Sequence, residues 1–316
     1  MRDWIQIKRA IVTGASGFIG SELVRLLVQD GIQVLAVVRP GSLKKNRLVQ
    51  SSLVRVCECD INHIRSLCHM GLTERFDVFF HFAWQGVYGP ARDDVFLQSA
   101  DMINTLAAIQ TAKDLGCEKF VGAGSQAEFG LMSVGEKISC RTPSRPLTPY
   151  GVAKAASRQL GSILAARLEI GFNWGAILSA YGPGDSPRTM VMDIAHKMLA
   201  GKKCDLSSGE QIWDYIYSTD AARAFYAIAA KGVNGKTYPV GTGEGRPLKS
   251  YIFDMYDVIG NGESKLNFGG IPLSDGAIRY LCADIAEFTA DTGFRPEIPF
   301  KEGIRTVAES LKRVER

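Results

Sequence analysis

The stretch Thr13-Gly-Ala-Ser-Gly-Phe-Ile-Gly20 follows a short apolar run at 10–13 and opens a segment whose apolar residues repeat at helical spacing. Gly14 permits a tight turn, Gly17 lets the backbone approach a pyrophosphate, and Gly20 allows the helix to pack closely on the strand. The helix N-terminus offers unpaired N–H groups and the positive end of its dipole to phosphates. The glycine spacing is a variant of the general dinucleotide fingerprint. With its strand and helix, the stretch predicts a dinucleotide-binding loop whose cofactor contacts are Gly14, Ser16, Gly17, Phe18 and Ile19.

Apolar runs of strand length alternate with helix-spaced segments through the first half of the chain. We expect helices at 19–30, 100–115 and 150–168, and strands at 10–13, 34–38, 53–56, 78–82, 120–123 and 172–178. Continuous apolar strands separated by helices indicate a parallel sheet covered on both faces. The pattern therefore predicts an α/β fold with a doubly wound parallel sheet of the Rossmann type.

The pattern changes at about residue 181, where Gly and Pro become frequent and the strand signals scatter. We interpret this change as the start of a smaller C-terminal lobe that binds substrate. The expected division is a dinucleotide-binding domain at 1–178, to which 213–242 returns, and a smaller lobe formed by 179–212 and 243–316.

Bulk composition excludes several classes of protein. The net charge is only +4, and the densest basic run, 39–47, has no interleaved aromatic residues, which argues against a nucleic-acid partner. The seven cysteines include no paired CxxC clusters, so we expect reduced thiols, no metal and a cytoplasmic protein. No apolar stretch approaches the length of a membrane span, so we expect no membrane partner.

The end of the second strand bears on which cofactor binds. NAD sites usually place an acidic residue there to bind the ribose 2′-hydroxyl, but this chain reads Val-Val-Arg-Pro at 37–40. Arg39 can meet a 2′-phosphate, with Lys44 or Arg47 assisting, or it can belong to a solvated basic turn. NADP(H) is therefore favoured, with NAD as the alternative. Asp60 and Ile61, after the third strand, are expected at the adenine edge, although Asp60 fits a plain loop equally well.

Tyr150 and Lys154 lie four residues apart in a segment expected to be helical, so they share one face of the helix. A free tyrosine has a pKa of about 10, too high for efficient proton transfer near neutrality. A neighbouring cation favours the phenolate and lowers that pKa. An isolated YxxxK pattern often arises by chance, so its meaning depends on the motifs that accompany it.

With these motifs the chain resembles the extended short-chain dehydrogenase/reductase family, the NAD(P)-dependent nucleotide-sugar epimerases, dehydratases and reductases. The resemblance covers nearly the whole chain. It rests on GASGFIG at 14–20, HFAW at 81–84, GSQAEFG at 124–130, YGVAK at 150–154, YGPG at 181–184 and WDYIYSTD at 213–220.

The resemblance implies a role for each matching residue. Tyr150 would be the catalytic acid/base, Lys154 would hold the nicotinamide ribose and lower the Tyr150 pKa, and Ser125 would hydrogen-bond the reacting oxygen. Hydride transfer to a carbonyl carbon builds negative charge on oxygen, so a donor and a proton source must reach that atom. Ala83 and Trp84 would lie against the cofactor, with burial in the core as the alternative for Trp84. The residues expected at the substrate are Gln126, Ser179, Tyr181, Arg188 and Trp213.

The chain also departs from the family pattern. Dehydratases usually carry an Asp-Glu pair directly after the Ser/Thr, whereas this chain has Gln126-Ala127, with Glu128 one position too late. Dehydration is therefore disfavoured. The asparagine usual before YGP is replaced at 179–180, and Trp213 stands where a phosphate-binding arginine is usual. Three other cations can replace these missing phosphate ligands or can be ordinary surface residues: Arg188, Lys197 and Arg246.

Three functions follow from the resemblance. The first is an NADPH-dependent reductase of a 4-keto-6-deoxy nucleotide sugar, because the segment 122–130 also resembles that of CDP-abequose or CDP-paratose synthase-like reductases. The second is a nucleotide-sugar 4-epimerase that keeps a tightly bound NAD. The third is a non-catalytic NADP-binding scaffold. In relatives the helices matching 100–115 and 150–168 pair two subunits, so a homodimer is expected, with burial inside one chain as the alternative.

Overall fold

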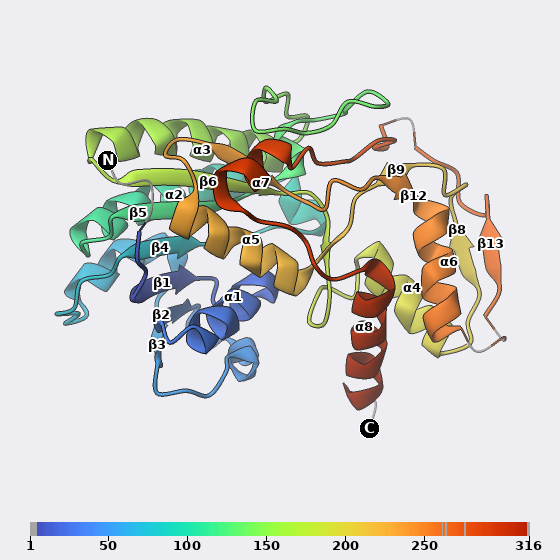
Figure 1. The fold of residues 1–316 in the computed structure, drawn as a ribbon, viewed down its shortest axis with the longest axis horizontal. Coiled ribbons are helices and arrows are strands. Elements are labelled where there is room, and N and C mark those ends of the chain that lie inside the picture. The colour runs from blue at the N-terminus through green and yellow to red at the C-terminus, as the bar shows by residue number, and fades with distance from the viewer. Residues whose placement is uncertain (1–4, 261, 263, 275, 315–316) are drawn as a thin grey trace.

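The computed structural model describes residues 5–314 except 261, 263 and 275. Its largest element is a seven-stranded sheet of order β11-β6-β5-β4-β1-β2-β3, with every neighbouring pair parallel (Figure 1). The strands are β1 (Arg9–Thr13), β2 (Gln33–Val38), β3 (Val54–Glu58), β4 (Val78–His81), β5 (Lys119–Ser125), β6 (Gly171–Ile177) and β11 (Thr237–Val240). The predicted Rossmann-type fold is confirmed.

Helices cover both faces of this sheet because its strands are apolar on both sides. Successive strand residues point to opposite faces, so Val12 packs in one core and Ile11 in the other. The first core lies under α1 (Phe18–Gln29) and α5 (Ser218–Lys231), and the second lies under α2 (Val95–Asp114) and α3 (Pro149–Arg167). Figure 1 shows these helix pairs on either side of the strands.

The strand order determines where a ligand can bind. From β1 the chain adds β2 and β3 on one side of the sheet, and β4, β5 and β6 on the other. The order therefore reverses between β1 and β4, and in doubly wound sheets ligands bind beyond the carboxyl ends of the strands at this point.

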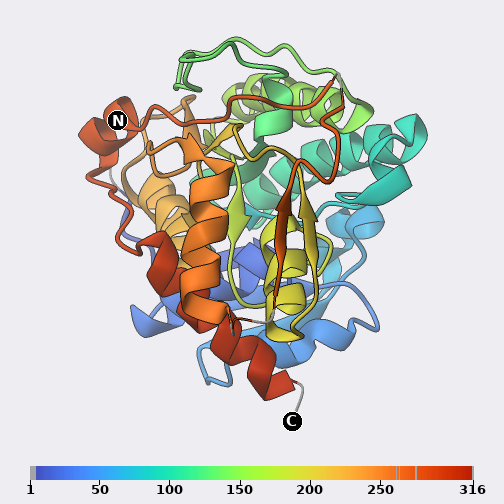
Figure 2. The ribbon, with the colours of Figure 1, turned by 90° about the vertical axis from the view of Figure 1, so that its right-hand side faces the viewer.

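A smaller lobe lies beyond the carboxyl ends of the strands. It is built on α4 (Met190–Leu199), α6 (Leu248–Ile259) and α8 (Phe300–Val314), which Figure 2 shows in yellow, orange and red. Three short strand pairs accompany them: β7 (Ala180–Tyr181) with β10 (Ile216–Tyr217), β8 (Cys204–Leu206) with β13 (Leu266–Phe268), and β9 (Ile212–Trp213) with β12 (Arg246–Pro247). Its core joins apolar side chains of the three helices to Tyr181, Tyr215, Tyr217 and Tyr251.

Later parts of the chain return to the sheet. Helix α5 packs on α1, and β11 pairs with β6 at the edge. Helix α7 (Ala286–Thr292) packs against α5, with Phe288 and Phe294 in the first core. By packing, the segment 286–294 lies with the sheet rather than with the lobe expected for 243–316, while the exact division into domains stays a prediction.

Helices α2 and α3 pack against one another and also expose apolar side chains. Phe96 is 87% exposed and Ile163 is 54% exposed. The other large apolar side chains exposed on these two helices are Val95, Ile103, Val152 and Leu160. Within the described part of the chain, no helix is both long enough and apolar enough to span a membrane.

Candidate active site

A cavity of about 730 Å³ lies beyond the carboxyl ends of β1, β4, β5 and β6, and we call it the strand-end cavity. Its volume is within the usual range for small-molecule sites. Its walls come from the glycine loop and the first turn of α1, from the ends of β5 and β6, from the start of α3 and from residues 184–187 and 189 of the second lobe. Its location matches the switch point of the sheet.

The glycine loop forms the tight turn that the sequence indicates. Gly14 has φ of +66°, and a Cβ on it would lie 2.8 Å from the backbone nitrogen of Ala83. A Cβ on Gly20 would lie 2.2 Å from the Gly14 carbonyl oxygen. Glycine is therefore required at both positions by backbone packing. Ser16 is buried, with its Oγ 3.4 Å from that of Ser42, and it lies outside the cavity wall.

The loop presents the first turn of α1 to the cavity. Gly17 is the N-cap in extended conformation, and no side chain caps this helix end. Gly17, Phe18, Ile19 and Gly20 all line the cavity. Because the first N–H groups of a helix lack intrahelical partners, this end suits an anion such as the pyrophosphate of a dinucleotide. The residues present thus fit the NAD(P) cofactor.

Ser125, Tyr150 and Lys154 come together on the opposite wall of the cavity. Ser125 ends β5, and its side chain lies beside that of Tyr150 on the cavity wall. Tyr150 lies in the first turn of α3, which Thr148 caps by accepting the N–H of Gly151 at 3.1 Å. The buried Lys154 donates to the Ala123 carbonyl at 2.7 Å.

The electrostatics of this group differ from the expectation. We expected Lys154 to lower the pKa of Tyr150, but its Nζ lies 5.9 Å from the Tyr150 ring centroid. Burial raises the pKa of Tyr150, and the nearby Ser125 hydroxyl and Arg92 guanidinium oppose this shift. Arg92 lies 4.3 Å from the centre of that ring. Burial also lowers the pKa of Lys154 to about 7, against the raising effects of Glu128 and Asp101.

Arg92 is a cavity residue that sequence reasoning missed. It ends a short 3-10 helix, η3 (Gly89–Arg92), and donates to the Val87 carbonyl at 3.4 Å. Its guanidinium lies over the face of Tyr150, where a phenolate would attract it more strongly than the neutral phenol. A lone loop arginine outside any motif gives no signal in the sequence, so only the structure identifies it.

Trp84 lines the cavity rather than lying wholly in the core. Its ring meets Tyr150 edge to face with centroids 6.1 Å apart, and the Lys154 ammonium lies 3.6 Å from the ring centroid. Its indole N–H donates to Gln98 at 2.9 Å. Ala83 is beside Gly14, outside the cavity lining, and its N–H lies 3.4 Å from the Thr13 hydroxyl.

The residues expected around the adenosine end are only partly at the cavity. Lys44 and Arg47 line it, whereas Arg39 is exposed and outside the wall. Asp60 caps the 3-10 helix η2 (Ile61–His69) by accepting the N–H of Asn62 at 2.9 Å, and Ile61 packs on the second core. Neither lines the cavity, so their contact with adenine stays a prediction.

Only some of the residues expected at the substrate line the cavity. Gln126 and Ser179 line the cavity. Trp213 lies outside the wall, and its indole N–H donates to Ser179 Oγ at 3.0 Å. Tyr181 is 1% exposed, and its hydroxyl donates to the Phe300 carbonyl at 3.1 Å. The expectation of a substrate contact from Tyr181 is therefore corrected, since its ring belongs to the core of the small lobe. Arg188 is exposed and outside the wall.

Two further residues that sequence reasoning missed, Tyr88 and Asp185, face one another across the cavity from different lobes. Burial and the Asp185 carboxyl raise the pKa of Tyr88 to about 12, and Asp185 accepts from Thr189 Oγ1 at 2.8 Å. Burial raises the pKa of Asp185 to about 6. The cavity therefore contains one buried carboxyl among the basic side chains of Lys44, Arg47, Arg92 and Lys154.

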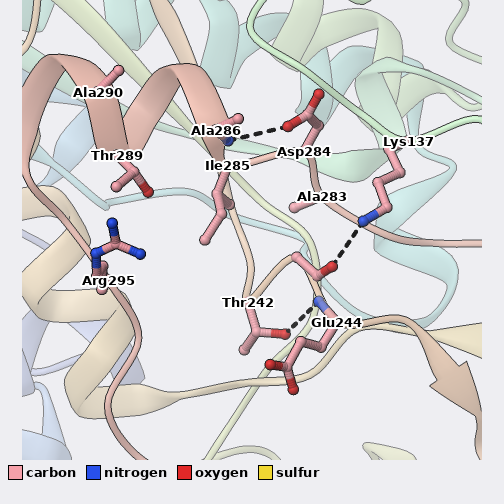
Figure 3. A pocket seen from close by; sticks show the side chains of 11 residues that line it. Lys137, Thr242, Glu244, Ala283, Asp284, Ile285, Ala286, Thr289, Ala290 and Arg295 are labelled. Atoms are coloured by element: carbon pink, nitrogen blue, oxygen red, sulfur yellow. Dashed lines mark hydrogen bonds between the residues drawn. The ribbon is translucent and has the colours of Figure 1, made fainter.

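A second cavity, of about 570 Å³, lies beside α7 (Figure 3). Figure 3 shows Lys137 bonded to the loop at 242–244 and Asp284 bonded to the backbone of Ala286. Arg295 lies on the opposite side of this cavity. None of the expected catalytic, cofactor or substrate residues lines it, so the candidate site is the strand-end cavity. Among the described residues, no cluster of three His, Cys, Asp or Glu side chains is arranged to hold a metal.

The packing of Gly14 gives a prediction for Gly14→Ala. The new methyl would overlap the backbone at Phe82 and Ala83, and a left-handed residue with a Cβ costs about 1–2 kcal/mol. We expect NAD(P) affinity to fall by about tenfold or more in a fluorescence titration. Gly31→Ala is the control, because Gly31 is also left-handed (φ +74°) but open around its Cβ position. Equal affinities for the two variants would contradict the account of the loop.

Known proteins resemble the chain over nearly its whole length. Residues 10–241 match the NAD dependent epimerase/dehydratase family. CDP-abequose synthase of Salmonella typhimurium is 28% identical over 96% of this chain and 97% of its own. Human dTDP-D-glucose 4,6-dehydratase is 24% identical over 96% and 89%. The structure of Thermus thermophilus UDP-glucose 4-epimerase with NAD superposes with a TM-score of 0.84 at 25% identity, covering 96% of this chain and 99% of that one.

These matches confirm the expected family and the expectation of an enzyme. The family match covers more than half of the chain, and it includes the glycine loop and the Ser125, Tyr150 and Lys154 group. The chain belongs to the NAD dependent epimerase/dehydratase family, and it is an NAD(P)-dependent oxidoreductase of the extended short-chain dehydrogenase/reductase type.

Proposed function

We propose that the protein reduces a 4-keto-6-deoxy nucleotide sugar at carbon 4 with NADPH. The observation that carries this proposal is that two hydroxyl side chains, Ser125 and Tyr150, lie together on the cavity wall, with no carboxylate at 126 or 127 beside them. The pair supplies a hydrogen-bond donor and a proton at one carbonyl oxygen. Similarity to a CDP-abequose synthase also supports a reductase, the class that the segment 122–130 resembles.

Each residue of the group has a step to perform. NADPH, when bound, supplies a hydride to carbon 4. Ser125 and Tyr150 donate hydrogen bonds to the carbonyl oxygen, and the Tyr150 hydroxyl proton passes to that oxygen as the C–H bond forms. The substrate gains one hydride and one proton, and Tyr150 is left as a phenolate that solvent reprotonates. The raised pKa keeps Tyr150 protonated until then, while Arg92 and Ser125 stabilise the phenolate.

Lys154 has a separate part in this scheme. Its ammonium has three N–H donors, and one of them goes to the Ala123 carbonyl. The others suit the ribose hydroxyls of the cofactor at the cavity wall. This role needs proximity to the ribose rather than to the Tyr150 hydroxyl, which agrees with the position of Lys154 over the Trp84 ring.

The surroundings of Ser125 argue against dehydration. Gln126 has no acid proton, and Ala127 has no polar side chain. Glu128 is fully buried, outside the cavity wall, and both of its carboxylate oxygens accept hydrogen bonds from protein groups. The positions directly after Ser125 thus supply no acid/base pair for removing water from the sugar.

The 4-epimerase remains the second candidate, because the exposed position of Arg39 weakens the argument for NADP. The related epimerase structure contains NAD. A non-catalytic scaffold is less well supported, since Ser125, Tyr150 and Lys154 are all retained in one site. We keep NADP(H) as the proposed cofactor because Lys44 and Arg47 line the cavity and suit a 2′-phosphate.

The proposed reduction is tested with Tyr150→Phe. The variant loses the proton donor but keeps the ring, so NADPH affinity should stay near wild type while kcat falls by about a hundredfold or more. The measurement is NADPH consumption with 4-keto-6-deoxy sugar nucleotides. Tyr88→Phe, at the other tyrosine of the cavity, should keep most turnover. Near-normal turnover by Tyr150→Phe would remove Tyr150 from the mechanism, and tightly copurified NAD without net consumption would favour the epimerase.

Cofactor preference is tested with three charge reversals. Arg47→Glu and Lys44→Glu place a carboxylate on the cavity wall, so each should weaken NADPH more than NADH, by about tenfold. Arg39→Glu should shift preference in the same direction by less, because its side chain is outside the wall. Titration with both cofactors measures the ratio. An unchanged ratio in all three variants would show that none of these cations reads the 2′-phosphate.

We propose a homodimer formed through the outer faces of α2 and α3. Ile103 and Ile163, each more than half exposed, lie on these helices and offer the apolar surface that a partner would cover. Ile103→Lys with Ile163→Lys should convert a dimer to a monomer in light scattering. Leu43→Lys, at an exposed leucine on the 3-10 helix η1 (Leu43–Arg47), should leave the mass unchanged. A monomeric wild-type protein would refute the proposal.

A further inference from the structure

Glu128 is a buried carboxylate whose contacts join three parts of the active site. Its Oε1 accepts the backbone N–H of Ser125 at 2.9 Å and the indole N–H of Trp174 at 2.8 Å. Its Oε2 accepts Arg158 Nε at 2.9 Å. Ser125 belongs to the end of β5, Trp174 to β6, and Arg158 to α3 one turn after Lys154. One carboxylate thus links the strand that carries the reactive serine to the helix that carries Tyr150.

Two glycines of β5 leave the space in which Trp174 reaches Glu128. A Cβ on Gly124 would lie 2.1 Å from Trp174 Nε1 and 2.4 Å from Glu128 Oε1. A Cβ on Gly122 would lie 2.1 Å from the Trp174 ring. The indole can therefore reach Glu128 across β5 only because both strand residues are glycine. A buried carboxylate that accepts three hydrogen bonds, one of them from an arginine, is held in one geometry.

Glu128 also completes the turn that orients Ser125. Ser125 caps the 3-10 helix η4 (Gln126–Glu128): its Oγ accepts the Ala127 N–H at 3.2 Å, and the Glu128 side chain accepts the Ser125 N–H in return. Reciprocal capping of this kind fixes the backbone at the capping residue. The Ser125 hydroxyl is therefore held on the cavity wall beside Tyr150 by a turn that Glu128 closes.

Glu128 also lies near Lys154, because the Trp174 indole that donates to Glu128 has its ring centroid 6.0 Å from the Lys154 ammonium. Burial lowers the pKa of Lys154 to about 7. The carboxylates of Glu128 and Asp101 raise that pKa, and Glu128 has the larger effect. The charged or titratable side chains around Lys154 are Glu128 on η4, Asp101 on α2, His81 on β4, and Tyr150 and Arg158 on its own helix. The ammonium is present below its pKa and is lost as the pH rises through about 7.

We propose that Glu128 is a positioning residue of this active site, which orients Ser125 toward Tyr150 and provides a buried negative charge for the Lys154 ammonium. It acts through Ser125 and Lys154, because its carboxylate is outside the cavity wall. The inference rests on the proposed reduction only for the role of Ser125. The part that concerns Lys154 and cofactor binding stands without it.

The first test measures NADPH affinity against pH for wild type, Glu128→Gln and Glu136→Gln. Glutamine keeps the shape of Glu128 but removes its charge, so Lys154 should lose its proton at lower pH. We expect Glu128→Gln to bind NADPH within about twofold of wild type at pH 6 and about fivefold or more weaker at pH 8. Glu136 is an exposed carboxylate in the following loop, and its variant should match wild type. Superposable curves for all three proteins would show that the negative charge of Glu128 does not support the Lys154 ammonium.

The second test is a double-mutant cycle between Ser125→Ala and Glu128→Gln in kcat. If Glu128 acts through Ser125, Glu128→Gln should lower kcat by about tenfold in the wild type but by less than about threefold once Ser125 is alanine. If the two substitutions instead lower kcat by factors that simply multiply in the double variant, Glu128 does not act by positioning Ser125. Trp174→Phe removes one donor to Glu128 and keeps its charge. It should therefore lower kcat in the same Ser125-dependent way and leave the affinity curve unchanged, which keeps the test valid if Glu128→Gln fails to fold.

The two tests also separate this inference from the proposed function. If the wild type binds NADPH but reduces no 4-keto sugar nucleotide, the proposed reduction fails, while the affinity curves still decide whether Glu128 supports Lys154. If the wild type turns over and Glu128→Gln matches Glu136→Gln in the affinity curves and the wild type in kcat, the reduction stands and the role of Glu128 fails.

Discussion

The close backbone contact at Gly14 and the reversal of strand order beside it determine the rest of this site. Because the order reverses between β1 and β4, the carboxyl ends of the central strands open onto a cavity. Because Gly14 turns tightly against Ala83, helix α1 begins directly at that cavity with its first N–H groups uncapped. The place for an anionic cofactor is thus fixed by backbone geometry before any side chain contributes.

The candidate catalytic side chains come from β5 and α3. Ser125 ends β5, and Tyr150 and Lys154 lie in the first turns of α3. Burial raises the pKa of Tyr150 and lowers that of Lys154, so each group is shifted toward its neutral form although they lie four residues apart. The cation that faces the Tyr150 ring is Arg92, which comes from another loop.

The sequence predicts the sheet well because its strands are continuous apolar runs and its turns carry glycine. It predicts that a smaller C-terminal lobe exists but not the elements of that lobe, whose strands are only two or three residues long and give no periodic signal. Motifs locate a residue along the chain but not the direction of its side chain. Tyr181 lies in a family motif yet points into the core, and Arg39 directly follows β2 yet lies outside the cavity. Arg92 and Asp185 belong to loops without a motif, so only tertiary structure brings them to the site.

The central claim is that hydride from NADPH is added at carbon 4 of a keto sugar with a proton from Tyr150. The most direct measurement uses NADPH carrying deuterium at the transferable position and follows the sugar product by mass spectrometry and NMR. The account predicts one deuterium at carbon 4 for each NADP formed. An isomerised sugar without deuterium and without NADP formation would contradict it.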